Sequence, residues 1–107
     1  VEPYTEDISD LLTVEDTYTR INASGALARI AEDFPESVEH VTPTFVELLS
    51  DENPLVRENA CWALGHLCAR DVTAALEDRA RGDDNADVRT RASWALAQIN
   101  NGDQRDD

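Results

Sequence analysis

Apolar side chains between residues 54 and 69 recur with the period of an α-helix. The stripe that they form on one side of the helix consists of Val56, Ala60, Ala63, Leu64 and Leu67. Asn53 stands at the N-cap position and Pro54 at the first helical position, where a missing N–H group costs no hydrogen bond. This pattern predicts a helix that begins at Pro54.

A shorter apolar segment precedes this helix. Residues 45–49 are nearly all apolar, Thr42 and Pro43 open the segment as a cap followed by a proline, and residues 50–52 form a polar turn. The pattern therefore predicts a unit made of a first helix (A), a tight turn and a second helix (B).

This unit is repeated along the chain. Residues 56–67, VRENACWALGHL, are followed 32 positions later by residues 88–99, VRTRASWALAQI, and residues 8–30 align without a gap on residues 45–67. The first alignment is shifted by 37 positions and contains eight identities. We predict A helices at residues 5–13, 36–50 and 72–81, and B helices at residues 17–32, 54–69 and 86–100.

Two short helices cannot bury both of their apolar faces, whereas stacked copies cover one another. We therefore predict an all-α fold, a short right-handed α-solenoid of three helix-turn-helix repeats in a single domain, residues 1–107. The expected repeats are residues 5–33, 36–69 and 72–100. Asn101 and Gly102 are expected to end the last helix, and residues 101–107 form a polar tail.

The segment LLSDENPLVRENACWALGHL, residues 48–67, resembles a HEAT repeat, in particular the short HEAT-like units of phycobilin lyases. The shared pattern is an apolar A helix, Asp in the turn, Val-Arg, and then Ala-Ala-x-Ala-Leu. The likeness covers about residues 5–100, and the chain departs from it at Val14, where the family favours Asp.

This resemblance also implies a ladder of aspartates and arginines between neighbouring repeats. Its members here are Asp51, Arg57, Asp83 and Arg89, which recur at the same offset. Arg20 has only Asp16 nearby as an equivalent carboxylate, so we expect it to be the ladder arginine that is free for a ligand.

Net charge restricts the partners. There are 23 acidic residues and 9 basic ones, all Arg, which gives −14. Such a surface repels nucleic acid and anionic membranes, and resembles the acidic surfaces of halophilic proteins. No signal peptide or membrane span is evident. Cys61 and Cys68 lie roughly 10 Å apart on one helix, too far for a disulfide, which favours reduced thiols and a cytoplasmic location.

No segment supplies the side chains of a catalytic, cofactor or metal site. Residues 83–87 resemble the start of a calcium loop, but Val88 occupies the glycine position and Trp94 the position of the bidentate glutamate. His40 and His66 have no further metal ligands at suitable spacing. We therefore predict no catalytic residue, no cofactor and no metal.

Trp62 and Trp94 are equivalent residues of two repeats and lie beside the apolar stripe of their helices, near Glu58. They are interpreted either as packing residues between B helices or as aromatic anchors on a concave B-helix surface, together with Glu58 and Arg20. We predict a non-catalytic scaffold that binds a protein or peptide on that surface. The alternative is a HEAT-like lyase or hydroxylase, or a subunit of one, and the solenoid ends offer a route to self-association.

Overall fold

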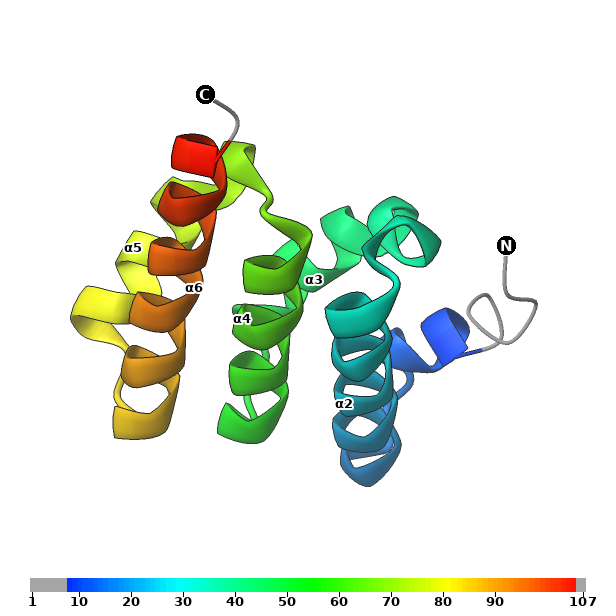
Figure 1. Ribbon diagram of the computed structural model, residues 1–107. Coiled ribbons are helices and arrows are strands. Elements are labelled where there is room, and N and C mark those ends of the chain that lie inside the picture. Colours follow the sequence, from blue (N-terminus) through cyan, green and yellow to red (C-terminus); the bar gives the residue numbers. More distant parts are fainter. Residues whose placement is uncertain (1–7, 106–107) are drawn as a thin grey trace.

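Three long helices run side by side and form one layer of the molecule (Figure 1). The computed structural model describes residues 8–105, with side chains as far as residue 101. The three helices are α2 (Thr17–Asp33), α4 (Pro54–Leu67) and α6 (Ala86–Arg105). Helix α4 packs against α2 on one side and against α6 on the other. These are the three B helices that the repeat predicts.

Polar side chains define where the B helices begin. The carboxylate of Asp16 accepts a hydrogen bond from the backbone N–H of Thr19, and Asn53 accepts one from Leu55. Asn85 does the same for the N–H groups of Asp87 and Val88. These caps satisfy backbone donors that have no partner within the helix.

The A helices form the second layer, and the middle one is shorter than predicted, whereas the third has the predicted length and is shifted by one residue. Helix α3 covers only Thr42–Leu48, and α5 covers Thr73–Gly82. Before α3 the chain forms two 3-10 turns, η2 (Pro35–Ser37) and η3 (Glu39–Val41), because Pro43 lacks the backbone N–H that a continuous helix from residue 36 would need at that position.

The first and third repeats vary this arrangement. One short turn, η4 (Arg70–Val72), precedes α5. In the first repeat, residues 10–13 form a 3-10 helix, η1 (Asp10–Thr13), and the predicted start at residues 5–7 lies outside the described residues.

Helix α6 also corrects the predicted boundary at Asn101 and Gly102, because it continues to Arg105. A glycine ends a helix when it adopts a left-handed conformation, and no described glycine has a positive φ. Helix α4 ends in that way at Cys68, whose φ is 51°. The N–H groups of Cys68 and Ala69 bond to the carbonyls of Gly65 and Leu64, which is a Schellman motif.

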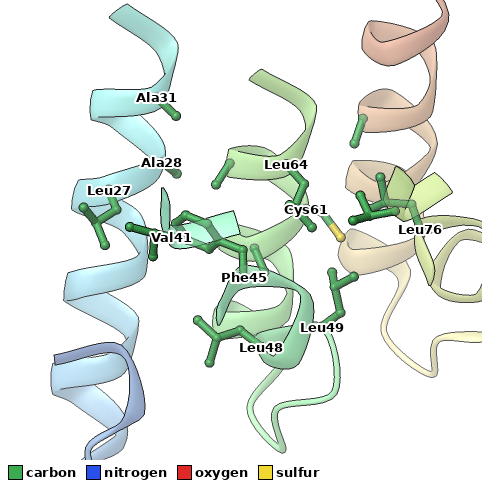
Figure 2. Packing of buried hydrophobic residues seen from close by; sticks show 14 of the residues in the cluster. Leu27, Ala28, Ala31, Val41, Phe45, Leu48, Leu49, Cys61, Leu64 and Leu76 are labelled. Atoms are coloured by element: carbon green, nitrogen blue, oxygen red, sulfur yellow. The ribbon is translucent and has the colours of Figure 1, made fainter. Parts of the chain in front are cut away.

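The hydrophobic core lies between the two layers. Figure 2 shows Val41 and Phe45 of the A layer directed between α2 and α4, and Leu76 directed toward α6. Phe45, Leu64 and Leu76 are fully buried. Small side chains line the contacts between B helices, which allows the helices to approach closely; the buried ones are Ala23, Ala28, Ala31, Ala60, Ala63, Ala92 and Ala95.

Candidate functional site

The side of α2, α4 and α6 that faces away from the A helices is here called the B-helix face. The repeat offsets of 37 and 32 residues identify the side chains that occupy equivalent places on it. Tyr18, Leu55 and Asp87 form one such row in the first turns of the helices. Both predicted tryptophans belong to another row, in which Gly25 is the equivalent of Trp62 and Trp94.

Both tryptophans are half-buried and pack against the hydrophobic core. The indole of Trp94 lies directly on α4, where a Cβ added to Gly65 would be 2.6 Å from its Cζ3 atom. The ring centroids of Trp94 and His66 are 5.0 Å apart in an edge-on arrangement. Trp94 therefore contributes to packing between B helices while part of its surface stays accessible.

Arg91 connects the two tryptophans. Its guanidinium lies 5.7 Å from the ring centroid of Trp62 and 5.3 Å from that of Trp94, within cation–π range. One of its nitrogens is 3.6 Å from the carboxylate of Glu58, and both side chains are partly exposed. Glu58 is thus anchored beside the tryptophans. The sequence analysis did not single out Arg91. A signal was present, because the equivalent residues of the first two repeats are both asparagine, Asn22 and Asn59, and only the third repeat has an arginine at this position.

A depression of about 340 Å³ opens next to this cluster. Its walls are formed by Glu58, Asp87, Thr90, Arg91 and Trp94. Two carboxylates, one guanidinium and an indole therefore surround one hollow on the B-helix face. Such a mixture of polar and aromatic groups suits a side chain of a protein partner better than a wholly apolar ligand.

Two exposed apolar residues on the B-helix face were also missed. Tyr18 is 77% exposed and Leu55 is 52% exposed, and they occupy equivalent positions of neighbouring helices. The alignment of residues 8–30 with residues 45–67 contains the signal that would have identified them: Tyr18 and Leu55 are aligned, and both are apolar although they lie outside the buried stripe. Their exposure provides an apolar surface next to the tryptophan cluster.

The predicted ladder lies at the turn between A and B helices and joins neighbouring repeats. Nε of Arg57 is 2.9 Å from Asp83 Oδ2, and its Nη2 is 3.0 Å from Asp83 Oδ1. In the preceding repeat Nε of Arg20 is 3.0 Å from Asp51 Oδ1. We call Arg20, Arg57 and Arg89, with Asp51 and Asp83, the turn ladder.

The expectation that Arg20 is free for a ligand is wrong. Its side chain is 9% exposed, and besides Asp51 it donates from Nη1 to the carbonyl oxygens of Val14 and Glu15. Asp16, its expected partner, instead caps α2 through hydrogen bonds from Thr19, which lower the pKa of this carboxyl group. Arg20 therefore belongs to the ladder, and it does not join Trp62, Trp94 and Glu58 on the B-helix face.

The pKa values of Asp83 and Arg57 follow from the geometry of the ion pair that these two side chains form. Burial of Asp83 acts to raise its pKa, but hydrogen bonds from Arg57 and the Asn85 N–H, with the charges of Arg57 and Arg79, hold that pKa below its usual value. In return, the hydrogen bonds that Arg57 donates to Asp83 raise the pKa of Arg57. Both groups are charged at neutral pH.

Other groups with reactive or metal-binding potential are dispersed. Burial raises the pKa of the Cys61 thiol to about 12, whereas Cys68 is exposed at the end of α4. Among the described side chains, no three from His, Cys, Asp and Glu are grouped so that they could hold a metal ion. None of the helices in residues 8–105 combines the length and hydrophobicity needed to span a bilayer.

Comparisons with known proteins agree with this architecture. A family model described as HEAT repeats matches residues 5–97. Two crystal structures of engineered proteins superpose with TM-scores of 0.75 and 0.74, at 23% and 25% sequence identity. Each alignment covers 92% of this chain but only 46% or 47% of the engineered protein, so the chain spans less than half the length of these neighbours. A comparison with curated proteins finds no significant match.

Proposed function

The chain belongs to the HEAT repeat family, and we propose that it is a non-catalytic scaffold whose B-helix face binds a segment of another protein. HEAT repeats are common scaffolds for protein interactions. The observation that carries the proposal is the grouping of partly exposed aromatic, apolar and charged side chains on that one face.

Apolar contact area supports this use of the face. Tyr18 and Leu55 leave large apolar side chains exposed on adjacent helices, and Trp62 and Trp94 expose part of their rings. Tyrosine and tryptophan are enriched among residues that dominate binding energy at interfaces. A segment lying across α2 and α4 would cover Tyr18 and Leu55 together.

Charge supports a basic partner. The hollow beside Trp94 contains the carboxylates of Glu58 and Asp87, and the whole chain carries a net charge of −14. A Lys or Arg from the partner would be attracted to these carboxylates. We therefore propose a partner segment that combines apolar side chains with Lys or Arg.

The test compares affinity-purified partners of three proteins. The wild type, the Tyr18→Ser/Leu55→Ser variant and the Phe34→Ser variant are each used to capture proteins from native lysate, followed by quantitative mass spectrometry. Phe34 is a matched control, because it is 58% exposed but follows the end of α2. Circular dichroism first establishes that all three proteins have the same helix content.

A partner recovered by the wild type and by Phe34→Ser, but lost with Tyr18→Ser/Leu55→Ser, would support the proposal. Calorimetric titration of that purified partner should then show affinity at least about tenfold weaker for the double variant, the loss expected from removing two apolar anchors. Equal affinity of the folded double variant and the wild type would contradict a role for this face.

A further inference from the structure

The hollow beside Trp94 lies between α4 and α6, and an equivalent place lies between α2 and α4. The hollow is lined by Glu58, Asp87, Thr90, Arg91 and Trp94. The repeat offsets of 37 and 32 residues give the equivalent residues in the same order: Ile21, Leu55, Glu58, Asn59 and Trp62. We call this second set the α2–α4 site.

Contacts place the α2–α4 site at the boundary between these two helices. Nδ2 of Asn59 donates to the carbonyl oxygen of Ile21 at 3.1 Å and to Oγ of Ser24 at 3.1 Å. Ile21 and Trp62 are half-buried against the hydrophobic core, whereas Leu55 is exposed. The leucine and the accessible parts of the isoleucine and the indole therefore give this site an apolar surface.

Two differences between the repeats make the hollow acidic instead. Glu58 stands at the position of Ile21, and Asp87 stands at the position of Leu55. The carboxylate of Glu58 is 3.6 Å from a nitrogen of Arg91. Asp87 is exposed and forms no ion pair with another of the described side chains. Two carboxylates thus accompany one guanidinium, which leaves one negative charge in the hollow without a partner.

We infer that one partner segment contacts both places, with an apolar side chain at the α2–α4 site and a Lys or Arg side chain in the hollow. The inference rests on the proposed function and adds the spacing of the partner's side chains. The apolar side chain covers Leu55, and the cation is attracted to Asp87 and Glu58. Because α2, α4 and α6 run side by side, the two equivalent places are one helix spacing apart, about 8 to 10 Å (Figure 1).

This separation favours an extended backbone in the partner. A polyproline II segment rises about 3.1 Å per residue with three residues per turn, so side chains three residues apart point the same way at about 9 Å. Side chains on one side of a β-strand are roughly 6.6 or 13 Å apart, which does not match.

A helical partner segment fits the two places less well. It would need seven residues to rise about 10.5 Å. It would also cross the B helices at nearly a right angle, which is a rare packing arrangement. The recognised motif is therefore an apolar residue and a basic residue three positions apart in an extended segment.

Selection from a random decapeptide library displayed on phage tests this motif. The library is selected on the wild type, on Tyr18→Ser/Leu55→Ser and on Glu58→Ile/Asp87→Leu, and the recovered peptides are sequenced. The last variant carries in the hollow the residues that the α2–α4 site has at the equivalent positions. Circular dichroism establishes that all proteins have the same helix content.

A fourth protein controls for the loss of two negative charges. Glu52→Ile/Asp84→Leu makes the same two kinds of substitution at the turn ladder, where the side chains are 86% and 92% exposed. It lowers the negative charge of the chain by the same amount as the hollow variant but leaves the B-helix face unchanged.

We expect the wild type and the charge control to enrich peptides with an apolar residue and a Lys or Arg three positions apart. Glu58→Ile/Asp87→Leu should instead enrich peptides with apolar residues at both positions. When the basic residue of an enriched peptide is replaced by Gln, fluorescence anisotropy should show about fivefold weaker binding to the wild type, because two partly exposed ion pairs are lost.

Two results would overturn this inference alone: a basic residue at no fixed distance or at seven positions from the apolar one, or the same peptides enriched by Glu58→Ile/Asp87→Leu. Failure of the proposed function gives a different result. If the wild type enriched no peptide, or if Tyr18→Ser/Leu55→Ser enriched the same peptides equally well, binding by the B-helix face and the motif would both be refuted.

Discussion

Substitution of Asp83 by asparagine tests whether the turn ladder stabilises the stack. The side chain of Asp83 is 1% exposed, whereas the adjacent Asp84 is 92% exposed, and both contact Arg57 at 2.9 Å. Asp83→Asn keeps the size of the side chain and removes its charge. Asp84→Asn makes the same change on the same arginine in water, so it is a matched control.

The magnitude follows from burial. Arg57 is 10% exposed and would lose its principal charged partner. Breaking a buried ion pair by neutralising one member costs about 3 to 5 kcal/mol. Because Asp84 still faces Arg57, we expect about 3 kcal/mol for Asp83→Asn. That loss lowers the Tm of a domain of this size by roughly 12 to 18 °C. An exposed pair contributes about 0 to 1 kcal/mol, so Asp84→Asn should change little.

Urea denaturation followed by circular dichroism measures the free energy of unfolding of each variant relative to wild type. The pH dependence of the difference for Asp83→Asn shows whether the charge of Asp83 causes it. The pKa of Asp83 is lower in the folded protein than its usual value. Its contribution is therefore complete above the unfolded pKa, about 3.9, and decreases as the pH falls through the lower folded value. The stability gap between wild type and Asp83→Asn should accordingly be constant near neutral pH and narrow below about pH 4.

Two results would refute this reasoning. If Asp83→Asn and Asp84→Asn had the same effect on the free energy of unfolding, burial would not govern the strength of the ladder. If the gap between wild type and Asp83→Asn stayed unchanged in acid, the lost stability would come from packing instead of the charged pair.

Three further predictions concern glycine contacts, the end of α4 and ionic strength. Gly65→Ala should destabilise the protein by about 1 to 3 kcal/mol in urea denaturation, because the new Cβ would collide with Trp94. Gly25→Ala should stabilise it by up to about 1 kcal/mol, because a Cβ there has no contact under 3.4 Å. The opposite order of the two stabilities would contradict this reasoning. Cys68→Gly should raise the free energy of unfolding by about 1 kcal/mol, since φ is 51° there, and an unchanged value would argue against strain. Finally, Tm measured by scanning calorimetry should rise between about 0.05 and about 1 M NaCl, because salt screens repulsion within a chain of charge −14, and a falling Tm would contradict this.

The sequence was sufficient to predict the B helices because three signals coincide in them. The 32-residue repeat, the helical apolar stripe and the cap at Asn53 all indicate α4, and it begins at Pro54 as expected. The A helices carry weaker signals. Pro43 was interpreted as a helix opening and does open α3, but Pro35 initiates a separate 3-10 turn, and the continuous helix predicted from residue 36 does not form.

The candidate site shows what a helical pattern cannot specify. Periodicity places Trp62 and Trp94 on one flank, but it does not determine which side chain of a neighbouring helix reaches them. Arg91 lies between the rings, and Gly65 provides the space for Trp94. The partner of Arg20 could not be found within its own repeat, because Asp51 belongs to the next repeat, 31 residues later.

This displacement of ladder partners has a structural consequence. Each arginine is oriented by its own turn and neutralised by the following one, so a stack of identical units always ends with an unpaired arginine at its C-terminal side. At the N-terminal side the corresponding aspartate would be unpaired, but here that position is Val14. The first repeat therefore differs from the other two at this ladder position, although the units resemble each other. Val14 thus interrupts the ladder in the first repeat, while Arg89 keeps the orientation of the other two ladder arginines.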